Sequence, residues 1–587
     1  MTVDSTTSAI ETAIETVFRI EFPRLVAGLA RRVDDVSLAE DLAQEALADA
    51  MVAWPRDGVP RNPGAWLMAV GKRKAIDRFR RDRTLASKYR QLAPLARDAE
   101  IDVDLDRDGI EDDRLRMMFV ACHPVLPIAA RTALTLRLVG GLSTAEIGRA
   151  YLQPESTVAQ RIVRAKKAIA AAGVPFEVPV GEERARRLGS VLEVIYVIFT
   201  EGYTATTGPE WTRPDLCHEA LRLGRQLARL SPDESEVHGL VSLMELQSSR
   251  LAARVGPSGE IVLLADQDRG RWDQLHIRLG LVALARAEKL RPELGPYGLQ
   301  AAIAACHSRA SSVGATDWPQ VVALYERLAA CTRPSPIIEL NRAVAVSMAS
   351  GPADALKIVD DIASSGSLDR YHLLHSVRGD LLAKLGRHDD ASVEFEHAAA
   401  LATNDAERSF SASRVQTCTA LAATPVLTDG RVLLRMLSLA DAPAWLAGED
   451  EEQLRWFQMP AATLADVERA IRRWQAGWME GGLHHWGIWI DGALVGGVEL
   501  SVRDDRRANV SYAVFAASRG RGVASAAVGL AAAWGRQNLP IDAVVAIIDE
   551  ANLASRGVAE RTGFALDGPA APWEHAESGV MLRYVRS

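Results

Sequence analysis

Residues 143–169 read STAEIGRAYLQPESTVAQRIVRAKKAI, and this stretch decides the fold of the N-terminal third of the chain. Ser143 and Glu146 have the spacing of a capping box, in which each side chain satisfies a free backbone N–H group of the other and starts a helix. Pro154 ends that helix and suits the first turn of the next one. The stretch therefore predicts two successive helices joined by a short turn.

The second of these helices has one apolar and one polar face. Val158, Ile162, Ala165 and Ile169 recur at the spacing of a buried helical face. The side chains that point away from it are Ser156, Thr157, Gln160, Arg161 and Arg164. Short polar side chains near a helix start can reach base edges in the major groove, and arginines further on can anchor phosphates. The pattern favours a DNA-recognition helix; the alternative is a helical hairpin with a solvated basic face.

A second cationic segment, 64–83, reads GAWLMAVGKRKAIDRFRRDR. Its apolar residues Trp66, Leu67, Val70, Ile76 and Phe79 are expected to form a buried stripe. Its cationic side chains are Lys72, Arg73, Lys74, Arg78, Arg80, Arg81 and Arg83. Cations neutralise phosphates and aromatic surfaces hold unstacked bases, so together with the helix downstream this segment indicates a nucleic-acid surface.

Composition restricts the class of protein. The chain has 587 residues, of which 48% are hydrophobic and 25% charged, and this excludes wholesale disorder. Its net charge of -8 argues against a protein coated in nucleic acid, though not against local basic patches. The five cysteines lack metal-ligand spacing, so we expect no metal site. The acidic start is unlike a signal peptide and no apolar run is long enough to span a membrane, so we expect a cytoplasmic protein.

Shifts in charge and periodicity divide the chain. Residues 61–90 carry ten basic side chains against two acidic ones, whereas residues 97–113 carry nine acidic side chains and two arginines, which is typical of a solvated linker. From residue 181 the pattern is helical, and after Pro425 it changes to strand-like runs. The expected parts are two helical modules at 12–83 and 111–172, an acidic linker at 84–110, a helical domain at 181–415 and an α/β domain at 428–587.

The helical middle domain shows an internal repeat. Gly379, Ala391 and Phe395 fall at the offsets of small and large residues in a tetratricopeptide (TPR) helix pair, and Ala355 lies 36 residues before Ala391. Small residues let two antiparallel helices approach closely, while the aromatic ring fills the gap to the next pair. We expect a TPR-like binding module; a generic helical bundle is the alternative.

A glycine-rich loop stands out in the last part. RGRGVA (519–524) follows a strand-like run at 509–515 and opens an alanine-rich helix. Glycines allow the backbone to approach a pyrophosphate, and the free N–H groups at a helix start point at its oxygens. A further strand-like run at 543–549 and a helix within NLASRGVAERTGF (552–564) follow. A dinucleotide-binding Rossmann fold would place its glycine motif near the start of the domain, whereas this one comes late.

Three segments of the N-terminal third resemble regions 2 and 4 of an extracytoplasmic-function (ECF) RNA polymerase sigma factor of the sigma-70 family. They are AEDLAQEALADAM (39–51), WLMAVGKRKAIDRFRR (66–81) and LTLRLVGGLSTAEIGRAYLQPESTVAQRIVRAKKAI (134–169). The resemblance covers about residues 12–172 and implies an all-α fold with a helix-turn-helix in region 4. It also implies core RNA polymerase and promoter DNA as partners.

The same resemblance implies roles for individual residues. Asp41, Gln44 and Glu45 would contact the polymerase clamp helices. The −10 element would be read and opened by Lys72, Arg73, Lys74, Arg78, Arg80 and Arg81. The −35 element would be read by Ser156, Thr157, Gln160, Arg161 and Arg164. Many family members carry Asn where this chain has Arg73, which bears on base preference at −10. The segments 183–203 and 335–346 resemble the C-terminal extension of a sigma-factor subgroup.

Residues 428–587 resemble a GNAT-type N-acetyltransferase, which implies acetyl-CoA as co-substrate. The residues that would hold its pyrophosphate are Arg519, Gly520, Arg521, Gly522, Val523, Ala524 and Ser525, and Asn552 would bind the pantetheine arm. Many members place a tyrosine, the acid for the departing thiolate, where this chain has Ala559. Ser555 is then the best remaining donor, and Glu499 is a candidate base acting through water. Alternatively, Glu499 is an exposed strand residue.

The sequence thus predicts a transcription initiation sigma factor that is regulated by its helical-repeat extension and carries a fused acetyl-CoA-dependent N-acetyltransferase domain. The sigma part is not expected to be an enzyme. Two alternatives remain at this level: an N-acetyltransferase whose helical arms serve partner or DNA targeting, and a GNAT-like domain that only senses acetyl-CoA.

Overall fold

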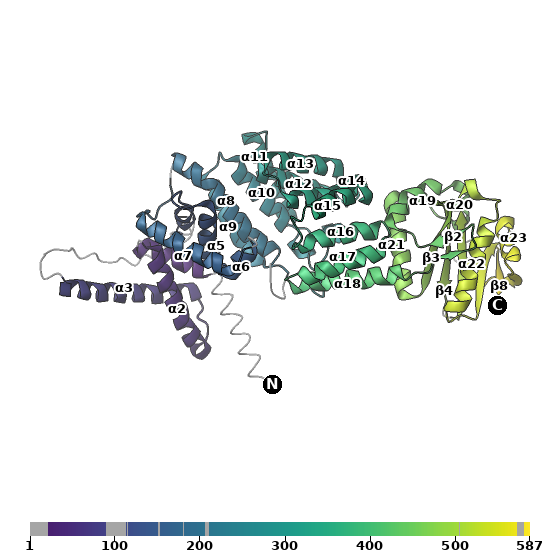
Figure 1. The fold of residues 1–587 in the computed structure, drawn as a ribbon, viewed down its shortest axis with the longest axis horizontal. Coiled ribbons are helices and arrows are strands. Elements are labelled where there is room, and N and C mark those ends of the chain that lie inside the picture. The colour runs from purple at the N-terminus through teal and green to yellow at the C-terminus, as the bar shows by residue number, and fades with distance from the viewer. Residues whose placement is uncertain are drawn as a thin grey trace. The chain divides into compact units, whose positions relative to one another are not determined.

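The computed structural model describes residues 21–33, 35–89, 113, 116–150, 153–179, 181–205, 211–503, 505–571 and 580–587. The chain divides into two compact units, Met1–Ser308 and Arg309–Ser587 (Figure 1). No helix among the described residues is long and apolar enough to cross a membrane.

The first unit is all-helical, as the sequence predicts. After a helical stretch at 21–33, its main helices are α2 (Val36–Asp57), α3 (Pro63–Tyr89), α5 (Ile128–Leu138), α6 (Thr144–Ala150), α7 (Glu155–Ala171), α8 (Gly181–Tyr203), α9 (Pro214–Leu230), α10 (Ser235–Ser248), α11 (Gln274–Leu290) and α12 (Pro296–Arg309). Helix α2 begins where the Asp35 carboxylate accepts hydrogen bonds from the Ser37 and Leu38 backbone N–H groups. Helix α3 continues past residue 84, where the linker was expected to begin, and residues 90–110 of that segment lie outside the described residues.

One hydrophobic core runs through the first unit. It includes Leu42 of α2, Leu67 of α3, Ile162 of α7, Ile195 of α8 and Leu240 of α10, all nearly or fully buried. The segments that the sequence divides into separate modules therefore share one apolar interior.

The helical part of the second unit consists of successive short helices. They are α13 (Trp318–Cys331), α14 (Pro336–Ala349), α15 (Pro352–Ser364), α16 (His372–Lys384), α17 (His388–Leu401) and α18 (Asp405–Ala422). Helices α16 and α17 approach closely at Gly379, where an added Cβ would lie 3.1 Å from the ring of Phe395. Ala355 and Ala391 are fully buried in the same core. These are the small and large residues that the repeat pattern picks out, while assignment to the TPR class stays a prediction.

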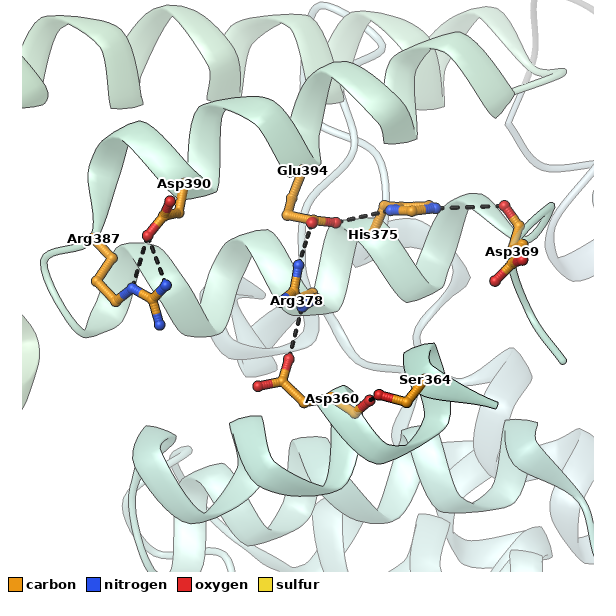
Figure 2. A network of polar contacts seen from close by, with 8 residues as sticks. All are labelled: Asp360, Ser364, Asp369, His375, Arg378, Arg387, Asp390 and Glu394. Carbon is orange, nitrogen blue, oxygen red and sulfur yellow. Dashed lines mark hydrogen bonds and ion pairs between the residues drawn. The ribbon is translucent and has the colours of Figure 1, made fainter. Parts of the chain in front are cut away.

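A polar network ties three of these helices together (Figure 2). The buried Glu394 carboxylate of α17 lies 2.8 Å from His375 Nδ1 of α16 and also contacts the Arg378 guanidinium. Arg378 Nε in turn donates to Asp360 Oδ1 of α15 at 2.8 Å. Because a buried carboxylate is costly unless it is paired, this network specifies how α15, α16 and α17 pack.

The end of the chain is an α/β domain, again as predicted. Its strands are β1 (Leu427–Thr428), β2 (Leu433–Arg435), β3 (Leu483–Ile490), β4 (Ala493–Val502), β5 (Arg507–Val514), β6 (Ala543–Asp549), β7 (Ala565–Pro569) and β8 (Met581–Arg586). They form one sheet in the order β1-β2-β3-β4-β5-β6-β8-β7. Its helices are α19 (Ala442–Gly448), α20 (Glu451–Phe457), α21 (Leu464–Glu480), α22 (Val523–Asn538) and α23 (Leu553–Arg561).

Helices cover both faces of this sheet, and two of its strands diverge. Val528 of α22 and Val558 of α23 belong to the apolar core on one face, whereas Trp445 of α19 and Ile471 of α21 belong to the core on the other. Strands β5 and β6 are parallel and pair only at Arg507↔Ala543, Ala508↔Val544 and Asn509↔Val545. Beyond these pairs the two strands separate, which opens a gap at the middle of the sheet.

Candidate functional site

Helix α7 has the two faces that the sequence predicts. Its buried residues are Val158, Ile162, Ala165 and Ile169. Of the predicted reading residues, Ser156, Thr157, Gln160 and Arg164 are exposed and Arg161 is half-buried. The Arg161 guanidinium is oriented by a hydrogen bond that it donates to Gln153 Oε1 at 2.7 Å. The structure therefore gathers these polar side chains on one solvent-facing side of the helix.

The start of α6 is built as the capping box predicts. The Ser143 backbone N–H donates to Glu146 Oε2 at 2.8 Å, and the Glu146 N–H donates to Ser143 Oγ at 3.1 Å. Helix α6 then meets the turn closely, because an added Cβ at Gly148 would lie 2.7 Å from the Gln153 carbonyl oxygen. These local contacts fix the angle at which α7 leaves α6.

Helix α3 departs from the predicted apolar stripe. Leu67 is buried, and Trp66 and Val70 are half-buried, but Ile76 is 39% exposed and Phe79 is 44% exposed. The prediction that Ile76 and Phe79 are buried was wrong, because the last buried residue of the described part of this helix is Ala75. Two large apolar side chains therefore lie on a cationic, solvent-facing part of α3.

The cations of α3 differ in their surroundings. Arg73, Arg78 and Arg80 are exposed, Lys72 and Lys74 are half-buried, and the Arg81 side chain lies outside the described residues. Burial, together with nearby Arg32, lowers the pKa of Lys72. Lys74 Nζ lies 3.0 Å from Asp49 Oδ2 and 3.6 Å from Glu45 Oε2, both on α2.

The predicted polymerase-contacting residues form an exposed row on α2. Asp41, Gln44 and Glu45 all face solvent, while Leu42 and Ala46 of the same helix are buried. Through the Lys74–Glu45 pair, the structure brings this row next to the cationic part of α3. The two surfaces that the sequence assigns to different partners are therefore neighbours.

A cavity of about 1010 Å³ lies where β5 and β6 separate. Its lining includes predicted residues from the glycine loop and from the start of α23, namely Arg519, Gly520, Gly522, Val523, Ala524, Ser525, Asn552 and Ser555. Arg521 and Glu499 are not among the lining residues. The structure thus joins two segments that are separated in sequence by a helix and a strand.

The glycine loop owes its shape to backbone conformation rather than to crowding. Gly520 and Gly522 have φ values of 72° and 76°, in the left-handed region that favours glycine. An added Cβ at Gly520 would meet nothing within 4 Å. Helix α22 then begins at Val523, so its first backbone N–H groups are free to bind an anion.

Arg519 and Asn552 already use part of their hydrogen-bonding capacity. Arg519 forms ion pairs with Asp450 at 2.8 Å and Glu452 at 2.7 Å, which compensate its charge. The hydrogen bonds from Arg519 lower the pKa of Asp450. The Asn552 side-chain oxygen accepts from the Ser555 backbone N–H at 3.0 Å and caps α23, which leaves its amide nitrogen to meet a ligand.

Sequence reasoning missed Tyr512, which lines the same cavity beside Ser555. Its hydroxyl donates to the Ser555 backbone oxygen at 3.4 Å, and burial raises the pKa of its phenol, so the hydroxyl keeps its proton at neutral pH. The cavity also includes Arg561, whose Nε lies 3.5 Å from Ser525 Oγ. The alternation of side chains along β5 could not have identified Tyr512, because its position beside Ser555 depends on where α23 packs.

Glu499 lies one strand away from the cavity. It pairs in register with His485 of β3 and with Ser511 of β5, and Ser511 lines the cavity. Glu499 is half-buried, and burial raises the pKa of its carboxyl group. His485 stacks on Trp474 at 3.7 Å, and burial lowers the pKa of the imidazole to about 3, so it is neutral at physiological pH. Glu499, the candidate base, does not border the cavity that Ser555 lines, so the structure does not bring these two residues together.

Four family models match the chain. They describe Sigma-70 region 2 at residues 18–84, Sigma-70 region 4 at 116–169, a family of unknown function (DUF6596) at 187–288 and an acetyltransferase (GNAT) domain at 431–565.

The chain is also similar in part to curated relatives and to solved structures. Uncharacterized protein R00370 of Rhizobium meliloti (strain 1021) is 44% identical over 391 residues, which cover 66% of this chain and 92% of that protein. ECF RNA polymerase sigma factor SigC of Mycobacterium tuberculosis is 30% identical over 143 residues, covering 24% of this chain and 74% of that protein. Among solved structures, RimL, a ribosomal L7/L12 alpha-N-protein acetyltransferase in complex with coenzyme A, is 16% identical with a TM-score of 0.25, covering 28% of this chain and 97% of that one.

The helix-turn-helix geometry of α6 and α7, the matched sigma regions and the identity to SigC agree with one another. The chain belongs to the ECF RNA polymerase sigma factor family, and it carries a fused GNAT acetyltransferase domain.

Proposed function

We propose that this sigma factor binds core RNA polymerase and directs it to promoters, with α7 reading the −35 element and α3 reading and helping to open the −10 element. The observation that carries the proposal is the solvent-facing polar row of α7, because polar tips near a helix start followed by arginines suit the major groove. The exposed Ile76 and Phe79 beside the α3 cations support melting, since apolar and aromatic surfaces hold unstacked bases. Asp41, Gln44 and Glu45 are the proposed polymerase contacts.

Run-off transcription with core polymerase tests this proposal. Promoters are first enriched from a random DNA library with the holoenzyme, and each enriched sequence then serves as a template. We expect a product that depends on both promoter elements and on the sigma chain. Failure to obtain a promoter-dependent product from any enriched sequence would reject the sigma proposal.

The helical extension is proposed to regulate promoter use. It offers a large surface for a protein or small-molecule partner, as stacked helix pairs commonly do. Cutting the chain after Ala172 would expose the shared core, because Arg187, Val191 and Ile195 are buried in the first unit. Removal of Arg309–Ser587 instead follows the boundary between the two units. Unchanged promoter output and unchanged regulation after that removal would contradict a role for the helical repeats at 309–415.

We infer that residues 428–587 bind acetyl-CoA and transfer its acetyl group to an amine. When bound, acetyl-CoA supplies a thioester that an amine can attack. The residues present fit it: the left-handed Gly520 and Gly522 and the free N–H groups at Val523 suit a pyrophosphate, and the cavity continues between the separated strands. The Asn552 amide nitrogen would hold the pantetheine arm.

The proton donors of this site differ from the usual pattern. Ala559 stands at the family's tyrosine position, and its methyl side chain has no proton to donate. Ser555 and Tyr512 both line the cavity and can protonate a departing thiolate. Glu499 is the proposed base and must act through water, because Ser511 rather than Glu499 borders the cavity.

Calorimetric titration of the full chain with acetyl-CoA tests this part. Gly522→Glu should abolish binding, because it forces a side chain into a left-handed backbone and places a negative charge near the phosphates. Gly529→Ala on the same helix is the matched control, since its Cβ would meet nothing within 4 Å. If the unmodified chain does not bind acetyl-CoA at millimolar concentration, the proposal is wrong and the domain has only a structural role. If Gly522→Glu instead changes promoter output, acetyl-CoA acts as a signal, as the sensing alternative holds.

A further inference from the structure

Two histidines and a glutamate lie together on helices α16 and α17 of the second unit. They are His375 of α16 and Glu394 and His397 of α17, and one nitrogen or oxygen atom of each lies within 4.8 Å of those of the other two. The two imidazole rings have centroids 5.3 Å apart. Glu394 is buried, His375 is half-buried and His397 is exposed, so the cluster extends from the interior of the helix pair to its surface.

The hydrogen-bond partners of His375 leave a position for a cation. Its Nε2 lies 3.5 Å from the Asp369 backbone oxygen, and its Nδ1 lies 2.8 Å from Glu394 Oε2 (Figure 2). Both oxygens can only accept hydrogen bonds, whereas a neutral imidazole has one N–H group and one lone pair. With the proton on Nε2, the Nδ1 lone pair faces a carboxylate oxygen, which is repulsive unless a cation lies between them. That cation is either a second proton on His375 or a metal ion.

The fold holds these three residues in place without an ion. Glu394 and His397 are three residues apart, so they are neighbours on one side of α17. His375 meets them from α16, which packs closely on α17 because Gly379 has no side chain. An added Cβ there would lie 3.1 Å from the Phe395 ring. The backbone positions of all three residues are therefore determined by the packing of the two helices.

The surrounding hydrogen bonds are those of a metal site. Glu394 Oε1 accepts from the Arg378 guanidinium, whose Nε donates to Asp360 Oδ1 at 2.8 Å. Asp360 balances the charge of Arg378, so the Glu394 charge is available to a cation at Oε2. The Asp369 backbone oxygen orients His375 from the other side of its ring. Metal-binding carboxylates and imidazoles are usually held by such outer contacts, which fix their orientation.

We propose that His375, Glu394 and His397 bind a divalent transition-metal ion of the Zn²⁺ class. Two imidazoles and one carboxylate suit Zn²⁺, whereas Mg²⁺ and Ca²⁺ prefer oxygen ligands alone. Tetrahedral bonds of about 2.0–2.1 Å place neighbouring ligand atoms about 3.4 Å apart, which the exposed His397 side chain can reach by rotation. Three protein ligands leave the fourth position to water or to a group of a partner. The expectation of no metal site rested on the cysteines, which take no part here.

Calorimetric titration of the full chain with Zn²⁺, after treatment with a chelator, tests the site. We expect one equivalent of Zn²⁺ whose affinity falls by about 100-fold or more in His397→Ala, since loss of an outer contact alone costs about 10–100-fold. His397 is exposed, so its replacement should leave the fold unchanged. Excess Mg²⁺ should not displace this equivalent, because it prefers oxygen ligands.

Matched variants distinguish this site from general binding to surface side chains. Glu396→Gln neutralises the exposed carboxylate next to His397 and should leave the affinity for Zn²⁺ unchanged. His218→Ala removes an exposed histidine of α9 and should also keep the equivalent.

Amide hydrogen exchange of α16 and α17 gives a second measurement, because the ion binds only where both helices are in place. At a Zn²⁺ concentration 100 times the Kd, protection of these amides should rise by about 100-fold. The same Zn²⁺ concentration should have little effect on exchange in His397→Ala.

Three results would overturn the metal site: unchanged Zn²⁺ binding in His397→Ala, an equal loss in Glu396→Gln, or unchanged exchange of α16 and α17 in saturating Zn²⁺. Each would leave His375 as an imidazolium that pairs with Glu394. None of these measurements uses polymerase, promoter DNA or acetyl-CoA. Failure of the metal site is therefore distinguishable from failure of the proposed functions.

Discussion

Helices α3 and α7 both carry several cationic side chains, but they differ in how far their apolar side chains are buried. In α7 every residue of the apolar face is buried, and none of them, Ile162 included, is more than 5% exposed. Helix α3 buries Leu67 but exposes Ile76 and Phe79. This difference shows that the spacing of apolar residues determines which side of a helix they share. Their burial requires, in addition, another element of the fold that packs along the whole length of that side. Where the partner is lacking, an apolar side chain on a cationic helix is available to a ligand.

The largest effect on stability should come from truncating a buried side chain of α7. Ile162→Ala should lower the free energy of unfolding by about 2–5 kcal/mol, because it leaves a cavity in a close-packed site. Hydrogen exchange of the α7 amides in the full chain measures this without assuming two-state unfolding. Val163→Ala, at a neighbouring position that is 51% exposed, should change protection by about 0.5 kcal/mol or less. Equal losses in the two variants would contradict the assigned faces.

Next in size are the arginines on the opposite side of α7. Arg161→Ala and Arg164→Ala should each weaken −35 binding by about 1–3 kcal/mol if the side chain contacts a base edge. The measurement is holoenzyme affinity for the promoter and for the same DNA with a substituted −35 element. A loss of equal size on both DNAs would show that the arginine contacts only phosphate.

A smaller effect is expected at the exposed end of α3. Phe79→Ala should reduce affinity for single-stranded −10 DNA by about 1 kcal/mol, because a base loses a stacking surface. The free energy of unfolding should change little, since Phe79 is 44% exposed. If the variant instead unfolds α3 and leaves single-strand affinity intact, Phe79 supports the fold and the contrast with α7 disappears.

The smallest effect should distinguish a cation that pairs with carboxylates from an exposed cation of the same helix. Lys74→Gln should hardly alter the salt dependence of DNA binding, because Glu45 and Asp49 already compensate this charge. Arg78→Gln, at an exposed position of the same helix, should lower the slope of log affinity against log salt by about one. Identical slopes for the two variants would mean that Lys74 leaves its carboxylates when DNA binds.

Local patterns predicted most of the fold and much of the cavity. The capping box, the buried face of α7 and the strand-like runs depend on neighbours within a few residues, so the sequence contains all the necessary information. The same holds for Gly520 and Gly522, whose left-handed backbone is a local requirement of the loop. The resemblance then identified sigma and GNAT regions that the family models also match.

Contacts between distant segments could not be predicted in this way. Arg519 was assigned to a pyrophosphate, but its charge is compensated by Asp450, which is 69 residues away in the chain. Tyr512 borders Ser555 only because α23, which packs against β6 and α22, begins next to β5. Glu499 has the strand position expected of a base, yet the cavity opens one strand further on.

By itself, therefore, the sequence determined the helices α6 and α7, the glycine loop with the strands on either side of it, and the families that these regions resemble. Only the tertiary structure decided that Ile76 and Phe79 remain exposed, that Arg519 is neutralised and that His375 meets Glu394 across two helices. The physical reason is the range of the interactions. Caps and periodic faces depend on residues a turn or two away, whereas burial and ion pairing depend on which distant elements the fold places opposite one another.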